Sequence, residues 1–212
     1  PSIAAEPVIR ERPVCRLWYK QPASKWEQAL PLGNGRLGAM VFGTVPSERL
    51  QLNEESLWAG EPTDAYPEDF AEHLTALQQL VLAGRISEAR RFGTKSMTAS
   101  PTSFRSYEPL ADLIFSFGHG PEVKGYRREL NLETGVARVS YQAGGLRWER
   151  EVLISAVDDV IAVRLAIDAP GKLNVKIRLT RDKDMKVAAV TDNRLHMDGQ
   201  IMDVAAPDGY DD

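Results

Sequence analysis

The stretch LPLGNGRLGAMVFGTV, from Leu30 to Val45, holds two apolar runs on either side of Gly33-Asn34-Gly35. An Asn-Gly pair between extended apolar runs is the strongest short-range hairpin signal, because both residues tolerate the positive φ that a tight turn requires. The second run is typical of a strand, so no helix N-terminus follows the glycines to hold a phosphate. We therefore predict a β-hairpin here, at the start of a β-rich fold.

The same β pattern continues along the chain. Between Leu173 and Leu179 apolar residues alternate with polar ones, which is typical of a strand with one face in solvent. Further strands are expected at 49–53, 113–117, 136–142, 146–154, 160–167, 172–180 and 186–197, the last range being a hairpin that turns at Asp192-Asn193. Strands at this spacing, separated by Gly and Asp turns, predict a mostly β antiparallel sandwich or barrel.

One part of the chain switches to helical spacing. Between Pro67 and Gly84, apolar residues recur at the positions that share one face of an amphipathic helix. These residues are Phe70, Leu74, Leu77 and Val81. Pro67 suits the first helical position and Gly84 the position after the last. A second helix is expected from Ser87 as its N-cap to about Ser96, followed by a loop at 98–106. We expect these one or two helices inside a single mostly β domain.

The ends of the chain lack these patterns. Residues 1–15 are Pro-rich and aperiodic, and we expect them to form a flexible N-terminal segment. Residues 16–202 carry the strand and helix patterns and are expected to form the sandwich domain. Residues 203–212 are expected to be a loop that leads to a missing C-terminal part.

Composition narrows the class of protein. The 212 residues are 43% hydrophobic and 26% charged, with a mean hydropathy of −0.31, as in ordinary globular domains. Lys and Arg number 26 against 30 Asp and Glu, and no basic stripe is present, so we expect no nucleic acid partner. The longest apolar run, Leu37 to Val45, is about half the ~18 residues of a membrane helix. We therefore expect no membrane partner.

Cysteine and histidine are too few for a metal centre. Cys15 is the only cysteine, which excludes a disulfide within the chain, and His73, His119 and His196 lie far apart in the sequence. Motifs for a nucleophilic serine, a phosphate loop or a zinc protease are absent. We therefore expect no metal and no cofactor.

Carboxylate pairs are the remaining candidates for catalysis, because glycosidases place two carboxyl groups across the bond that they cleave. The visible pairs are Glu54-Glu55, Asp158-Asp159 and Asp182 with Asp184. Adjacent residues on a strand point to opposite faces, so these pairs do not converge on one substrate unless they lie in a loop. The favoured interpretation is that they are solvated turn charges.

The segment from Asn53 to Gly60 is dense in residues that recognise sugars. Aromatic faces stack on sugar C–H surfaces, and amides and carboxylates bind hydroxyls. Asn53, Glu54 and Trp58 therefore form a candidate saccharide-contacting edge. The alternative is that Trp58 covers the core where a strand ends.

Several longer motifs carry a resemblance to a known family. They are WEQALPLGNGRLGAMVFG at 26–43, ERLQLNEESLWAG at 48–60, YEPLADL at 107–113 and YRRELNL at 126–132. Together they resemble the opening of glycoside hydrolase family 95, the inverting α-L-fucosidases, in order and over about residues 16–180. Ala111 departs from the pattern, because the family usually has Gly at this position.

The resemblance implies an antiparallel β-super-sandwich with one or two inserted helices, placed before an α/α barrel. In the family the general acid and the residues that activate water lie in that barrel, so no catalytic residue is assigned to this chain, which we expect to be inactive alone. Loops of such a sandwich edge the active site in related enzymes. This adds Asn34 and Arg36 to Asn53, Glu54 and Trp58 as substrate-edge candidates.

The resemblance also implies partners and a location. The partners are fucosylated glycans, bound through the parent enzyme, and the missing α/α barrel, and a periplasmic or secreted location is favoured. Two alternatives stay open, a freestanding carbohydrate-binding module and a purely structural interaction domain with an exposed apolar patch. An unpaired sheet edge would also favour a homodimer.

Overall fold

The computed structural model describes residues 15–59, 66, 68–98 and 106–202. The chain divides into two compact units. The sandwich unit comprises the residues up to Leu57 and Pro109–Gln200, and the helical unit comprises Trp58–Glu108 and the residues from Ile201. The helices are inserted between two strands of the sandwich in sequence, as expected, and form a compact unit of their own. The expectations for residues 1–14, Pro67, 99–105 and 203–212 lie outside the described residues.

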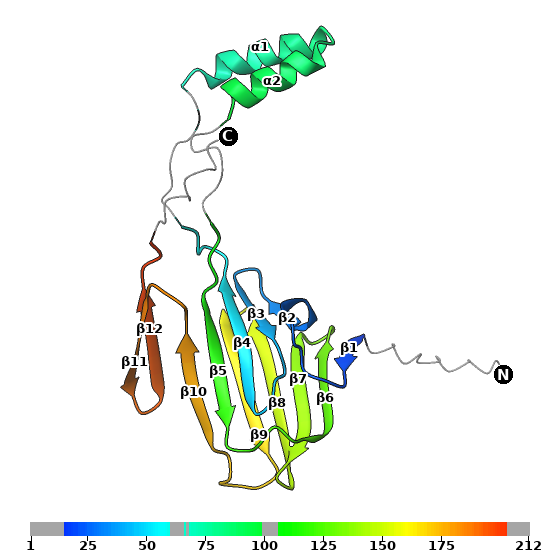
Figure 1. Cartoon of the computed structure of the whole chain (residues 1–212), viewed down its shortest axis with the longest axis vertical. Helices are drawn as coiled ribbons and strands as arrows, with labels where there is room; N and C mark the ends of the chain where they lie inside the picture. Colours follow the sequence, from blue (N-terminus) through cyan, green and yellow to red (C-terminus); the bar gives the residue numbers. More distant parts are fainter. Residues whose placement is uncertain (1–14, 60–65, 67, 99–105, 203–212) are drawn as a thin grey trace, which may run out of the picture. The chain divides into compact units, whose positions relative to one another are not determined.

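The sandwich unit is built from two antiparallel five-stranded sheets (Figure 1). The first has the order β1 (Arg16–Tyr19), β6 (Lys124–Asn131), β7 (Val136–Ala143), β8 (Leu146–Ser155) and β9 (Val160–Ile167). The second has the order β10 (Val175–Thr180), β5 (Ala111–Phe117), β4 (Ser47–Glu54), β3 (Leu37–Val41) and β2 (Leu30–Gly33), with the short 3-10 helix η1 (Trp26–Gln28) before β2. A separate hairpin pairs β11 (Met185–Thr191) with β12 (Arg194–Gly199). The predicted antiparallel β-sandwich is confirmed.

The hairpin that opens the sandwich is confirmed, with one correction to its turn. Strands β2 and β3 pair so that Gly33 lies opposite Gly38. The backbone N–H of Asn34 donates to the carbonyl of Leu37 at 3.2 Å, so Gly35 and Arg36 are the two central residues of the turn. Gly35 has a φ of 99°, whereas Asn34 does not have a positive φ. Asn34 therefore acts through its side chain rather than through an unusual backbone conformation.

Both sheets contribute to one hydrophobic core. Strand β4 alternates as predicted, because Leu50 and Leu52 are buried while Arg49 and Gln51 on the other face are half-buried. The core contains Leu30, Ala39, Val41, Leu50, Leu52, Phe115 and Phe117 from the second sheet, and Leu130, Ala137, Val139, Tyr141, Ala143, Trp148 and Val152 from the first. Burial of apolar area between the two sheets is the main stabilising contribution to this unit.

A buried ion pair crosses the core and was not predicted. Glu48 on β4 and Arg150 on β8 are each only 3% exposed, and their side chains meet at 3.0 Å. The second oxygen of Glu48 accepts a hydrogen bond from the backbone of Gly43 at 2.8 Å. The guanidinium of Arg150 lies over the rings of Phe117 and Tyr141, at 5.1 and 5.3 Å from their centroids. The pair therefore links the two sheets by charge as well as by packing.

The helical unit has two helices, α1 (Phe70–Leu82) and α2 (Ile86–Ser96). Gly84 has a φ of 71° and donates to the carbonyl of Val81, and Arg85 donates to the carbonyl of Leu80, which is the Schellman arrangement expected at a C-terminal glycine. The predicted N-cap of the second helix is wrong. Arg85, not Ser87, occupies that position, because the second helix begins directly after the motif that ends the first.

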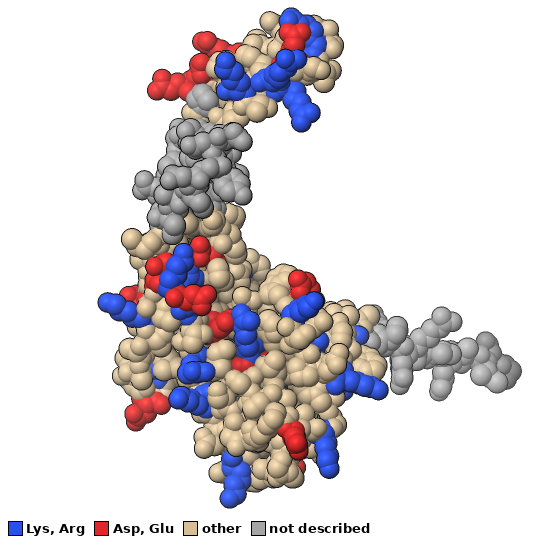
Figure 2. Space-filling view, viewed as in Figure 1, with Lys and Arg blue, Asp and Glu red and all other residues tan. Residues whose placement is uncertain are grey.

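Charged side chains are mixed on the surface. On the face of the sandwich in Figure 2, Lys and Arg stand among Asp and Glu. Some charged side chains of the sandwich unit are paired: Glu151 on β8 accepts hydrogen bonds from Arg138 on β7 and Arg164 on β9. None of the helices in the described residues is long and apolar enough to cross a membrane.

Candidate functional site

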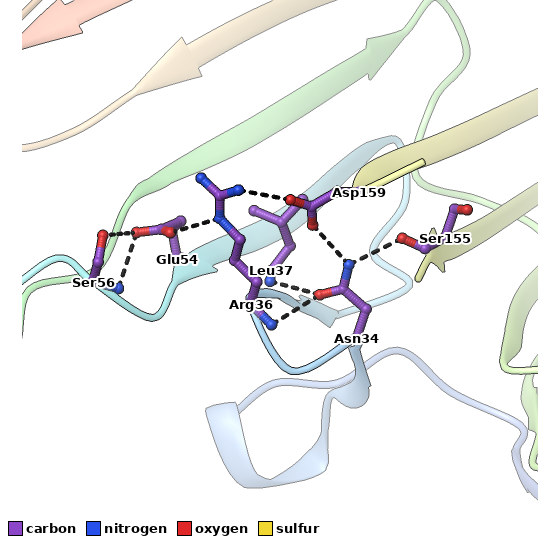
Figure 3. A network of polar contacts seen from close by, with 7 residues as sticks. All are labelled: Asn34, Arg36, Leu37, Glu54, Ser56, Ser155 and Asp159. Atoms are coloured by element: carbon purple, nitrogen blue, oxygen red, sulfur yellow. Dashed lines mark hydrogen bonds and ion pairs between the residues drawn. The ribbon is translucent and has the colours of Figure 1, made fainter. Parts of the chain in front are cut away.

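A network of polar side chains joins three connections of the sandwich unit (Figure 3). The first is the turn between β2 and β3, which carries Asn34 and Arg36. The second is the end of β4, which carries Glu54, and the third is the turn between β8 and β9, which carries Asp159. We call these four residues the edge network. Three of them are predicted substrate-edge residues, and Asp159 is an addition that the structure reveals.

Asn34 organises the edge network. Its Oδ1 accepts hydrogen bonds from the backbone N–H groups of Arg36 at 3.0 Å and Leu37 at 2.7 Å. Its Nδ2 donates to the carbonyl of Ser155 at 3.0 Å and to Oδ1 of Asp159 at 2.9 Å. A primary amide has two donor hydrogens and two acceptor lone pairs, so these four bonds use its whole capacity. Asn34 is therefore placed to hold the two turns together.

Arg36 lies between two carboxylates. Its Nε donates to Oε1 of Glu54 at 3.1 Å, and its Nη1 donates to Oδ2 of Asp159 at 2.9 Å. The side chain is 62% exposed. In the described part of the chain these bonds use Nε and one hydrogen of Nη1, which leaves the hydrogens of Nη2 available to a ligand. The pKa of Arg36 is raised above the ordinary value of arginine, mainly by the hydrogen bond to Glu54 and next by the charge of Asp159.

Glu54 is held as a carboxylate. Its Oε2 accepts hydrogen bonds from Oγ of Ser56 at 2.7 Å and from the backbone N–H of Ser56 at 3.0 Å. The bond from the Ser56 hydroxyl, followed by the bond from Arg36, lowers the pKa of Glu54 below its ordinary value. At neutral pH this group accepts hydrogen bonds and has no proton to donate.

The backbone of the β8–β9 turn positions Asp159. This residue has a φ of 54°, a left-handed conformation that aspartate adopts more readily than most non-glycine residues. The turn is closed by Ser155, whose Oγ donates to Oδ2 of Asp158 at 2.8 Å and accepts from the backbone N–H of Asp158 at 3.0 Å. The carboxylate of Asp159 thereby reaches both Asn34 and Arg36.

The other two predicted edge residues are Asn53 on β4 and Trp58 in the helical unit. Asn53 is half-buried on β4, opposite Gly38 of β3, and its Cβ lies 3.3 Å from the place where a Cβ on Gly38 would stand. Trp58 belongs to the helical unit, is 51% exposed and pairs with Tyr107 through an isolated β-bridge. The Trp58 and Tyr107 rings meet edge to face, with centroids 5.0 Å apart. The structure brings together Asn34, Arg36 and Glu54.

The edge network suits recognition of polar ligands rather than acid–base chemistry. It presents a guanidinium with unused hydrogens and two carboxylates, all of which bind hydroxyl groups. Both carboxylates engage the same guanidinium, and the lowered pKa of Glu54 means that this residue has no proton to donate to a leaving group at neutral pH. Among the described residues no group of three or more His, Cys, Asp or Glu could hold a metal ion.

Sequence reasoning missed Asp159, Ser155 and Ser56. Asp158-Asp159 was interpreted as a solvated turn pair, and the turn itself is confirmed. An aspartate before a strand is a signal for a left-handed turn residue. The partner could not be read from that signal, because Asn34 and Asp159 are 125 positions apart.

The sequence of this chain is similar to those of known glycosyl hydrolases. A sequence model of the glycosyl hydrolase family 65 N-terminal domain matches residues 17–210. The chain is 37% identical over 165 residues to "Alpha-L-fucosidase 2" of Arabidopsis thaliana, an alignment that covers 76% of this chain and 19% of the relative. It is 33% identical over 156 residues to "Probable alpha-fucosidase A" of Aspergillus niger, covering 71% of this chain and 20% of the relative.

The alignments cover only a small part of each relative's length. A third one, "Probable alpha-fucosidase A" of Aspergillus oryzae, is 28% identical over 155 residues, with 21% of its length covered. The chain thus spans about a fifth of the length of the curated relatives that it matches. The matching family model is named for family 65, whereas the motifs resemble family 95. Both point to an N-terminal domain of a glycoside hydrolase. The chain belongs to the glycosyl hydrolase family 65 N-terminal domain family and is related to α-fucosidases.

Proposed function

We propose that this chain is the non-catalytic N-terminal sandwich domain of an inverting α-L-fucosidase-like glycoside hydrolase of family 95. The observation that supports it most is the 37% identity to a protein named as an α-L-fucosidase, in a segment that spans only a fifth of that protein. The domain family adds that the segment is an N-terminal domain of a glycosyl hydrolase. In this proposal the sandwich stabilises an α/α barrel that carries the chemistry.

The non-catalytic role is supported by the chemistry of the edge network. Inversion needs one protonated carboxyl group as acid and a second carboxylate that activates water, with space for that water between them. Glu54 has a lowered pKa and is bound to Arg36, and Asp159 is bound to the same side chain. A guanidinium therefore lies where an inverting enzyme would need a water molecule.

A role at the edge of the glycan site suits the same residues. Nη2 of Arg36 can donate to a sugar hydroxyl, and Glu54 can accept from one. Trp58, half-exposed in the helical unit, stays a separate candidate, because an aromatic face suits the C–H surface of a sugar. Asn53 remains a candidate by its position on β4, and Asn34 would act as a positioning residue. The ligand would be a fucosylated glycan, and the parent enzyme would be periplasmic or secreted.

The first test measures release of free L-fucose from a fucosylated oligosaccharide. We compare this 212-residue chain with the parent polypeptide extended through its downstream domain. Activity in the extended protein alone is the expected result. Turnover by the short chain that Glu54→Gln abolishes, while the exposed-site control Glu133→Gln retains it, would overturn the proposal and place a catalytic centre at the edge network. Binding of the glycan by the short chain without turnover would favour a freestanding carbohydrate-binding module.

The edge role is tested in the extended enzyme. Arg36→Gln removes the guanidinium that faces the ligand, and a charged hydrogen bond is worth about 1.5–3 kcal/mol, so we expect KM to rise at least about ten-fold with little change in kcat. Arg178→Gln, an exposed position on β10, is the matched control. An unchanged KM in both variants would exclude the edge network from the glycan site.

A further inference from the structure

Helix α1 carries more apolar surface than α2 covers. On one side, α2 packs against it: the rings of His73 and Phe92 meet edge to face at 5.5 Å, and the Leu77 side chain lies 3.8 Å from the place of a Cβ on Gly93. The rest of the apolar surface remains open. On α1 the exposed fractions are 41% for Leu74, 49% for Val81 and 87% for Leu82, and Ile86, the first residue of α2, is 60% exposed.

The open surface is concave. Leu77, Gln78, Val81 and Leu82 line a groove of about 390 Å³ along the C-terminal half of α1. None of these four side chains is charged, so the groove suits apolar side chains rather than a charged ligand. We call these four residues the α1 groove.

The helical unit has little core of its own. Among its described residues, Ala89 is the one that is buried, and α1 has no buried residue at all. Helices shorter than about 12–15 residues are marginal in water, and their stability in proteins comes mainly from packing an apolar face. The two helices span 13 and 11 residues. We therefore expect a further surface to pack against the α1 groove.

The length of the relatives indicates what that surface is. About four-fifths of each relative lies outside the segment that this chain matches. Ile201, which follows the last strand, belongs to the helical unit rather than to the sandwich. The residues that follow the last strand, from Ile201, therefore share a unit with the α1 groove.

We propose that the α1 groove docks apolar side chains of the downstream polypeptide of the same parent enzyme. The inference rests on the proposed function in taking that downstream polypeptide as the neighbour. It assigns the helical unit a specific task, which is to carry an interdomain contact while the sandwich unit is stabilised by its own core. Docking at the groove then accounts for the exposure of Val81 and Leu82 on α1.

Hydrogen exchange of the parent enzyme tests the proposal. We compare the amides of residues 74–86 in the parent polypeptide and in the 212-residue chain. Docking predicts exchange at least about ten-fold slower in the parent polypeptide, because a covered helix opens less often. Equal exchange in the two proteins would overturn the proposal, and so would protection in the short chain that depends on its concentration, because a second copy would then occupy the groove.

Matched variants of the parent enzyme localise the contact. Val81→Glu places a charge in the α1 groove, whereas Gln79→Glu places the same residue two positions away, outside the groove. We expect the first to lower the melting temperature by at least about 3 °C and to abolish the protection, and the second to change neither. Equal effects of the two variants would contradict docking at this groove.

Fucose release from the same samples separates the two proposals. A parent enzyme that does not release fucose but protects residues 74–86 would refute the proposed function and retain the docking surface. A parent enzyme that releases fucose without protecting these residues would do the reverse.

Discussion

The sandwich unit and the helical unit differ in how much of their apolar surface is buried. In the sandwich, two sheets cover each other, and Val41 and Leu50 are fully buried. In the helical unit, Ala89 is the buried residue among those described, and Leu82 is 87% exposed. Amphipathic spacing in a sequence therefore shows that a face seeks a partner and does not show that the partner lies within the same chain.

The largest expected effect comes from the ion pair inside the sandwich. Arg150→Met keeps most of the side-chain volume but leaves Glu48 buried without its countercharge, and breaking a buried pair in this way costs about 3–5 kcal/mol. Urea unfolding followed by tryptophan fluorescence measures the loss, because Trp148 is buried whereas Trp18, Trp26 and Trp58 are about half-exposed. The double variant Glu48→Gln/Arg150→Met should recover at least half of it, and a double variant as unstable as the single one would contradict this account.

The same variant should show a stronger pH dependence of stability than the wild type. Burial raises the pKa of Glu48, and the charge of Arg150 opposes that rise, so removing Arg150 raises the pKa further. The unfolded chain releases this proton above about pH 4.3, while the folded variant retains it. Stability therefore falls as the pH increases from there toward the folded pKa. The deficit relative to the wild type should be larger at about pH 8 than at about pH 5.

Truncation of the core is the next largest effect. Leu50→Ala removes a fully buried side chain from between the sheets and is expected to cost about 3 kcal/mol, because the cavity adds to the lost transfer free energy. The same unfolding measurement applies. A loss under about 1 kcal/mol would mean that the two sheets collapse around the cavity and that the core is less tightly packed than its burial indicates.

Much of the sandwich could be predicted because its strands alternate. Strand β9 occupies Val160–Ile167, as the pattern predicted, and the hairpin at β11 and β12 turns where Asp192-Asn193 was expected. Strand β1 escaped prediction, since four residues are too few for a pattern and the strand exists by pairing with β6. Glu48 escaped because a charge at a buried position contradicts alternation until its partner Arg150 is known.

The candidate site was also predicted only in part, because local sequence patterns show its residues but not their distant partners. Asn34, Arg36 and Glu54 could be predicted because they are polar residues at strand ends within the motifs of the family resemblance. The structure places them in one network. Asp159 was visible as a turn residue only. Its contacts with Asn34 and Arg36 depend on how the first sheet lies against the second, which no local pattern encodes.

Loss of the amide that joins the two turns should have an intermediate effect. Asn34→Ala removes four hydrogen bonds at a partly buried position, and we expect a cost of about 2 kcal/mol, because each such bond contributes about 0.5–1.5 kcal/mol and part is replaced by water. Asn193→Ala in the exposed β11–β12 turn is the control, with an expected loss under about 0.5 kcal/mol. Equal losses would show that the edge network does not stabilise the sandwich.

The smallest effect on stability is expected from Leu82→Ala, which tests the difference in burial between the helical unit and the sandwich unit. Leu82→Ala makes the same chemical change as Leu50→Ala, but its side chain is 87% exposed and alanine favours a helix, so the 212-residue chain should change by under about 0.5 kcal/mol. Urea unfolding followed at 222 nm by circular dichroism reports on the helices. A loss above about 1 kcal/mol in the short chain would mean that another part of this chain or a second copy already covers Leu82. A loss that arises only in the parent enzyme would assign that cover to the downstream polypeptide.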